Sequence, residues 1–119
     1  IGWVERKRLP SFLKGFDVAL IPFSTHPWNE ARNPLKLWEY LAAGLPVVAT
    51  RIPEIEKYAE AVYLAATPAE FEAAISDALE HPSPERLRRG AELAREHSWE
   101  HLTRQTLAEV LAAASARQA

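Results

Sequence analysis

Three short, continuously apolar segments constrain the fold of this chain more than any other feature of its sequence. They cover residues 18–21, 46–49 and 61–65. Apolar residues follow one another in each segment without polar alternation, which is the pattern of strands that are buried on both faces of a parallel sheet. Pro46 fits this interpretation because the first residue of a strand can lack its N–H group. The segments therefore predict three parallel strands.

Helical segments separate these runs. Asn33 followed by Pro34 predicts a helix start, with an asparagine cap and proline at the first helical position. Gly44 predicts the end of that helix. A short helix is expected over residues 10–16, before the first strand.

The C-terminal half of the chain is expected to be helical. Thr67 and Glu70 have the spacing of a capping box, and Ser83 and Ser98 each stand at the start of a further helix. The order of strand, helix, strand, short helix, strand and helices predicts an α/β fold. We expect a doubly wound parallel sheet with right-handed crossovers, followed by C-terminal helices.

Composition narrows the class of protein. The chain has 119 residues, 48% apolar and 25% charged, which suits one soluble domain with its own core. A formal net charge of −2 argues against nucleic acid as a partner, and the absence of cysteine excludes disulfides and thiolate chemistry. No apolar run approaches the roughly 20 residues of a membrane span, so we expect a cytoplasmic protein. The chain lacks methionine and opens with Ile1-Gly2-Trp3-Val4, so we expect it to be a piece of a longer protein.

The loop after the first predicted strand is the expected functional region. Ligands of doubly wound sheets bind beyond the carboxyl ends of the strands, and residues 23–33 form an unusually long connection there. The loop leads to a helix start, where N–H groups and the helix dipole favour an anion. Lys36 lies in the first turn, where its positive charge opposes the helix dipole. A phosphate bound between the lysine and the helix start would explain this position. A Lys36–Glu39 pair on a solvated helix face is the alternative, and the residues alone favour it.

Glu39 is a second candidate, because it lies between Trp38 and Tyr40 in a largely apolar helix. A carboxylate there could accept two hydroxyl hydrogen bonds at once, as a ribose diol requires. An ordinary surface glutamate is an alternative of equal weight. The four histidines lack metal-ligand spacing. The sequence also contains no glycine-rich dinucleotide motif, Walker loop or nucleophile elbow.

Two stretches of the sequence resemble GT-B glycosyltransferases. Residues 9–23, LPSFLKGFDVALIPF, look like the helix and strand that precede the donor site of these enzymes. Residues 33–50, NPLKLWEYLAAGLPVVAT, are similar to their donor-binding helix and the strand after it. Residues 98–100, Ser-Trp-Glu, resemble the opening of their C-terminal helix. The group that the chain resembles most is the bacterial group 1, family 4-like transferases of cell-surface polysaccharide synthesis.

The resemblance implies that residues 1–119 are the C-terminal part of a GT-B domain that binds a nucleotide sugar. The sheet would be part of a Rossmann-like sheet. Its first strands and the N-terminal acceptor domain would lie outside this chain. Glu39 would hold the ribose hydroxyls of a UDP-, GDP- or similar sugar, and Asn33, Leu35, Lys36 and Ser24 would complete the donor site. Neither a metal nor a cofactor is expected.

The whole enzyme would be a hexosyltransferase that acts on a glycan or lipid-linked acceptor at the inner face of the membrane. Any peripheral contact with the membrane would come through the N-terminal domain, and the isolated chain would be inactive. No catalytic residue is assigned, because Ala31 stands where the family often has the first of two glutamates, and Glu30 is one residue out of register. A UDP-sugar 2-epimerase-like enzyme and a non-catalytic, flavodoxin-like interaction module are the alternatives.

Overall fold

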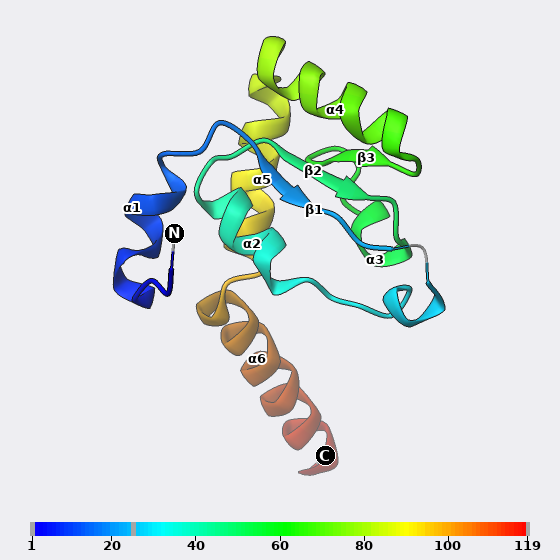
Figure 1. Cartoon of the computed structure of the whole chain (residues 1–119). Helices are drawn as coiled ribbons and strands as arrows, with labels where there is room; N and C mark the ends of the chain where they lie inside the picture. The colour runs from blue at the N-terminus through cyan, green and yellow to red at the C-terminus, as the bar shows by residue number, and fades with distance from the viewer. Residues whose placement is uncertain (1, 25, 119) are drawn as a thin grey trace.

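Three parallel strands form the centre of the fold, as the apolar runs predict (Figure 1). A computed structural model describes residues 2–24 and 26–118. Its strands are β1 (Ala19–Ile21), β2 (Val47–Thr50) and β3 (Tyr63–Ala65), in the order β1-β2-β3. The expectation of a longer protein rests in part on the first residue, Ile1. This residue lies outside the described residues.

Helices cover both faces of the sheet, so the predicted double winding is confirmed. The helices are α1 (Leu9–Leu13), α2 (Leu35–Ala42), α3 (Pro53–Glu56), α4 (Pro68–Glu80), α5 (Pro84–Glu96) and α6 (Trp99–Gln118), with 3-10 turns η1 (Arg6–Arg8) and η2 (Pro27–Asn29). Val47 and Ala49 belong to the core that includes residues of α2, α3 and α5, whereas Val48 packs with residues of α4. Every residue of β2 is buried, which is why this run shows no polar alternation.

The three C-terminal helices begin where the sequence predicts. Side-chain oxygens of Thr67, Ser83 and Ser98 accept hydrogen bonds from the backbone N–H three residues further on, at 3.2, 3.3 and 3.2 Å. Glu70 Oε2 accepts a further bond from Ala66 N at 2.7 Å, which completes the cap of α4. Local capping residues therefore fix these three helix starts.

The start of α2 differs from the prediction. Asn33 is exposed and does not cap the helix, because Pro34 occupies the N-cap position with φ −77° and ψ 103°. Proline has no side-chain acceptor, and Asn33 is one residue too far from the first turn to serve as its cap. The end of the helix is as predicted: Gly44 adopts φ 76°, a conformation that glycine adopts without strain.

Close packing against α5 fixes the place of α2 on the sheet. Leu37 and Leu41 of α2 are buried, and Gly90 of α5 lies so near that an added Cβ would be 2.8 Å from Leu41 Cδ2. A glycine at this position lets the two helices approach. The helix that carries Lys36 and Glu39 is therefore held by both the sheet and α5.

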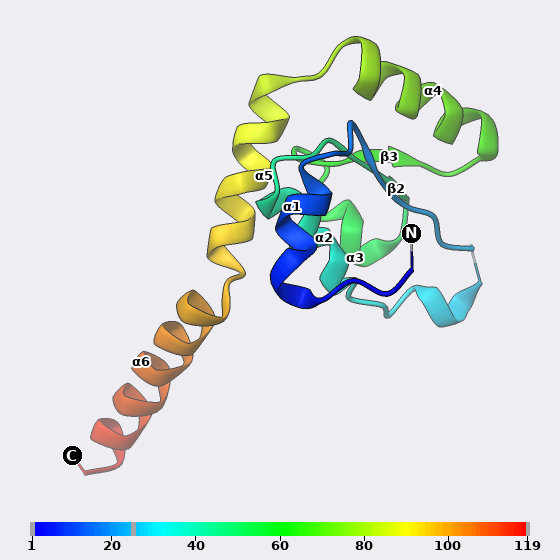
Figure 2. The same cartoon turned by 60° about the vertical axis from the view of Figure 1, so that its left-hand side comes forward.

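The last helix stands apart from the α/β body. Figure 2 shows α6 extending beyond the end of α5, away from the sheet. Every residue from 99 to 118 is exposed, and the helix continues to Gln118. Within the described part of the chain, no helix is long and apolar enough to cross a membrane.

Candidate functional site

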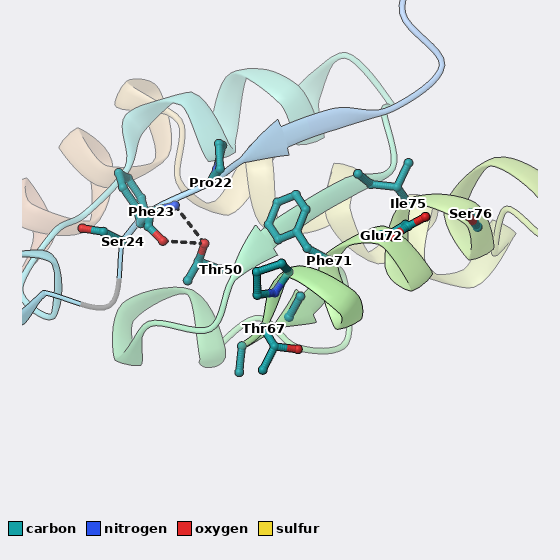
Figure 3. A pocket seen from close by; sticks show the side chains of 12 residues that line it. Pro22, Phe23, Ser24, Thr50, Thr67, Phe71, Glu72, Ile75 and Ser76 are labelled. Carbon is teal, nitrogen blue, oxygen red and sulfur yellow. Dashed lines mark hydrogen bonds between the residues drawn. The ribbon is translucent and has the colours of Figure 1, made fainter.

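A hollow of about 690 Å³ opens at the carboxyl edge of the sheet (Figure 3). The strands are parallel, so their carboxyl ends meet at this edge, where ligands of doubly wound folds bind. Phe71 and Ile75 of α4 form an apolar side of the hollow. Ser24, Thr67 and Glu72 add polar groups to its lining.

Thr50, the last residue of β2, fastens the start of the long loop. Its Oγ1 accepts a hydrogen bond from Phe23 N (2.8 Å) and donates one to Phe23 O (2.9 Å), as Figure 3 shows. These bonds continue the connection between β1 and β2 beyond Ile21, the last residue of β1 that pairs with β2. The sequence prediction did not include Thr50, although a hydroxyl at the end of an apolar run is a signal for such a role.

Asn29 closes the loop on itself. This side chain is 9% exposed, and its Nδ2 donates hydrogen bonds to Ser24 O (2.7 Å) and Ser24 Oγ (2.9 Å). The hydroxyl of the predicted site residue Ser24 therefore helps to hold the loop at the rim of the hollow. Trp28 is 82% exposed and stacks on His26, and it does not belong to the lining of this hollow.

The first turn of α2 presents Leu35 and Lys36 to solvent. Leu35 is 71% exposed, and Lys36 is exposed as well. Within the described residues, Lys36 and Glu39 form no ion pair. No side chain caps this helix start in the described part of the chain. A cation and a helix N-terminus therefore lie together at the end of the loop.

Glu39 lines a separate pocket of about 300 Å³ between α1 and α2. The rest of the lining is mostly apolar and consists of Leu9, Pro10, Leu13, Ala42 and Ala43. Arg6 adds a guanidinium group to the same pocket. The arrangement can accept and donate hydrogen bonds at an apolar surface, which suits a ligand with both a flat apolar part and hydroxyl groups. The run of basic residues before α1 is the sequence signal that could have identified Arg6.

Of the five predicted site residues, one lines each of the two hollows and three line neither. Ser24 borders the hollow at the carboxyl edge, whereas Glu39 lines the pocket between α1 and α2. Asn33, Leu35 and Lys36 lie along the chain between them and are exposed. The described residues contain no group of three or more histidine, aspartate or glutamate side chains that could hold a metal ion.

The fold is an α/β domain of Rossmann-like type, with one hollow at the carboxyl edge of its parallel sheet and a second pocket between α1 and α2. The chain belongs to the glycosyl transferase-like family, whose sequence profile matches residues 1–112. The family match confirms the resemblance to glycosyltransferases that the sequence motifs indicate.

A Bacillus subtilis (strain 168) protein, TuaH, is similar to part of the chain. Its name assigns it to teichuronic acid biosynthesis as a glycosyltransferase. The two sequences are 41% identical over 56 residues, which is 47% of this chain and 14% of the relative. The match therefore spans about a seventh of the length of that protein. No solved structure matches the chain significantly.

Proposed function

We propose that this chain binds a nucleotide-diphosphate sugar as the donor-binding part of a glycosyltransferase of cell-surface polysaccharide synthesis. Family membership and the name of the Bacillus relative support the reaction class and the pathway. The observation that carries donor binding is the position of Glu39. Its carboxylate lines an apolar-walled pocket with Arg6, about one helical turn after Lys36.

The chemistry of these groups matches the parts of such a donor. The carboxylate of Glu39 can accept hydrogen bonds from both ribose hydroxyls, which are stronger than bonds between neutral groups. The apolar walls from Leu9, Pro10 and Leu13 suit a nucleobase. Lys36 and the first N–H groups of α2 would attract the diphosphate, and the sugar would extend towards Ser24. The proposal needs neither a metal nor a cofactor.

In the whole enzyme, we propose transfer of the sugar to a glycan or lipid-linked acceptor on the cytoplasmic side of the membrane. A UDP-sugar 2-epimerase would bind the same donor but would change the configuration of its sugar without an acceptor. Analysis of the products with and without an added acceptor separates the two reactions. A non-catalytic interaction module would bind no nucleotide at all.

Titration of UDP and GDP into the chain by calorimetry tests the proposal. Glu39→Ala should weaken binding of the preferred nucleotide by about 1.5–3 kcal/mol, the range for hydrogen bonds to a charged group. Because Glu39 is exposed, the circular dichroism spectrum should not change. Glu72→Ala is the matched control, since Glu72 lines the other hollow. If Glu72→Ala weakens binding and Glu39→Ala does not, the donor site lies at the carboxyl edge instead.

A further inference from the structure

Three partly buried aromatic side chains meet beside α2. Trp38 belongs to α2, Tyr58 follows α3, and His97 caps the end of α5. The imidazole of His97 stacks on the indole of Trp38, with ring centroids 3.7 Å apart and ring planes 7° apart. Tyr58 meets both rings edge-on, at centroid distances of 4.9 Å from Trp38 and 5.5 Å from His97. The function proposed above does not use this cluster.

Hydrogen bonds fix the imidazole at both nitrogens. His97 Nδ1 lies 2.8 Å from Leu93 O, and a carbonyl can only accept, so Nδ1 carries the hydrogen. In the neutral ring, Nε2 then accepts from the hydroxyl of Tyr58 at 3.2 Å. Burial raises the pKa of Tyr58, so its hydroxyl keeps the proton that this bond needs. His97 is therefore held in one orientation against the face of Trp38.

The stacking on Trp38 joins the residue that ends α5 to α2, in addition to the packing between the two helices. Leu41, three residues after Trp38 and on the same side of α2, packs against Gly90. Contacts spread along one side of a helix resist rotation of that helix about its axis, and the stack of His97 on Trp38 holds the residue next to Glu39. Glu39 is the residue after Trp38, so the two positions differ by about 100° around the axis of α2. Glu39 lines the pocket between α1 and α2. Rotation of α2 would therefore move the carboxylate of Glu39 relative to Arg6.

We propose that His97 is a positioning residue of the donor site, which fixes the rotation of α2 by stacking on Trp38 and thereby directs the carboxylate of Glu39. This inference rests on the proposed function, because it assigns to His97 the task of aiming Glu39 at the ribose. His97 itself touches no donor. It acts through Trp38 and the backbone of α2.

A double-mutant cycle tests the proposal with whichever of UDP and GDP binds the wild-type chain more tightly. His97→Ala should weaken binding about tenfold, which corresponds to about 1.4 kcal/mol. His97→Phe keeps a planar ring on Trp38 and should restore most of the affinity. His101→Ala removes an exposed histidine four residues further on and should change nothing. In the Glu39→Ala background, His97→Ala should have no further effect, because the residue that it positions is gone.

The outcomes separate this inference from the proposed function. Equal affinities of the wild type and His97→Ala overturn the positioning role and leave donor binding intact. The positioning role is also overturned if His97→Ala weakens binding as much in the Glu39→Ala background as in the wild type. His97 would then affect binding independently of Glu39. Absence of nucleotide binding by the wild type overturns both. If His97→Ala loses its helical circular dichroism signal, Trp38→Leu takes its place in the cycle, with the same expected results.

Discussion

The position of Lys36 in the first turn of α2 is the main sign that this helix start binds a ligand. Lys36 is exposed and opposes the helix dipole, and the described structure shows no ion pair between Lys36 and Glu39 to compensate. The simple explanation by a surface ion pair, which the residues alone favour, therefore loses its support. A bound diphosphate would account for the position of this lysine.

Lys36→Ala should therefore weaken binding of the preferred nucleotide while leaving the free energy of unfolding unchanged or slightly higher. The loss of affinity should shrink as the salt concentration rises, because salt screens charge attraction. Calorimetry at two salt concentrations measures this difference. Lys14→Ala, at an exposed lysine after α1, is the control and should not alter binding. A Lys36→Ala chain that binds normally and unfolds more easily would contradict the assignment.

The side chain of Thr50 makes a prediction about stability. Its hydroxyl satisfies both Phe23 N and Phe23 O, although Phe23 is 27 residues away in the sequence. Thr50→Val keeps the shape but leaves both backbone groups without this partner, so it should cost about 1–3 kcal/mol of unfolding free energy. Thr50→Ser keeps the hydroxyl and should recover most of the loss. Urea unfolding followed by circular dichroism measures the three chains, and equal midpoints for all of them would show that water replaces the hydroxyl.

At the scale of elements, the contact between α2 and α5 depends on Gly90. Alanine is a better helix former than glycine by about 1 kcal/mol, yet its Cβ would lie 2.8 Å from Leu41 Cδ2. Leu41 is 2% exposed, so it has little room to move. Gly90→Ala should therefore be destabilising, because overpacking of a buried contact costs about 1–3 kcal/mol.

Urea unfolding measures this effect, and a second variant identifies its cause. Gly90→Ala combined with Leu41→Ala should lose less than the sum of the two single losses, since the new methyl group enters the space left by the leucine. Gly2→Ala is the control, because an added Cβ there meets nothing within 4 Å. A stabilised Gly90→Ala chain would mean that helix propensity outweighs the close approach.

At the scale of the whole molecule, the sheet leaves an apolar edge open. β1 is an outer strand of the described sheet, and Leu20 on it is 42% exposed. Unpaired N–H and C=O groups beside an exposed leucine favour pairing with another chain. We therefore expect the isolated chain to self-associate at micromolar concentration and to transfer no sugar.

Analytical ultracentrifugation of the wild type and of Leu20→Lys tests this expectation. A lysine at an outer strand opposes edge-to-edge pairing, so the variant should be more monomeric. Gln105→Lys, at an exposed polar position of α6, is the control for the effect of added charge. A wild-type chain that is monomeric and transfers sugar would contradict both parts of the prediction.

The sequence by itself determined the order and type of the elements. The continuous apolar runs predicted parallel strands, and Thr67, Ser83, Ser98 and Gly44 marked helix ends through interactions within a few residues. Such signals are visible in a sequence because both partners lie in one short window. Two helix boundaries differ from the prediction: Pro34 and not Asn33 occupies the N-cap position of α2, and α1 ends at Leu13 and not at residue 16.

Only the tertiary structure decided which side chains meet. It directed Glu39 to a pocket with α1 and Ser24 to the carboxyl edge, although the sequence grouped them in one site. It also joined Thr50 to Phe23, and His97 to Tyr58 across 39 residues. Such pairs leave no periodic trace in the sequence, because they depend on how far each helix rotates when its apolar face meets the sheet. The chemistry of the candidate site is thus encoded in residue types, but its geometry arises from packing.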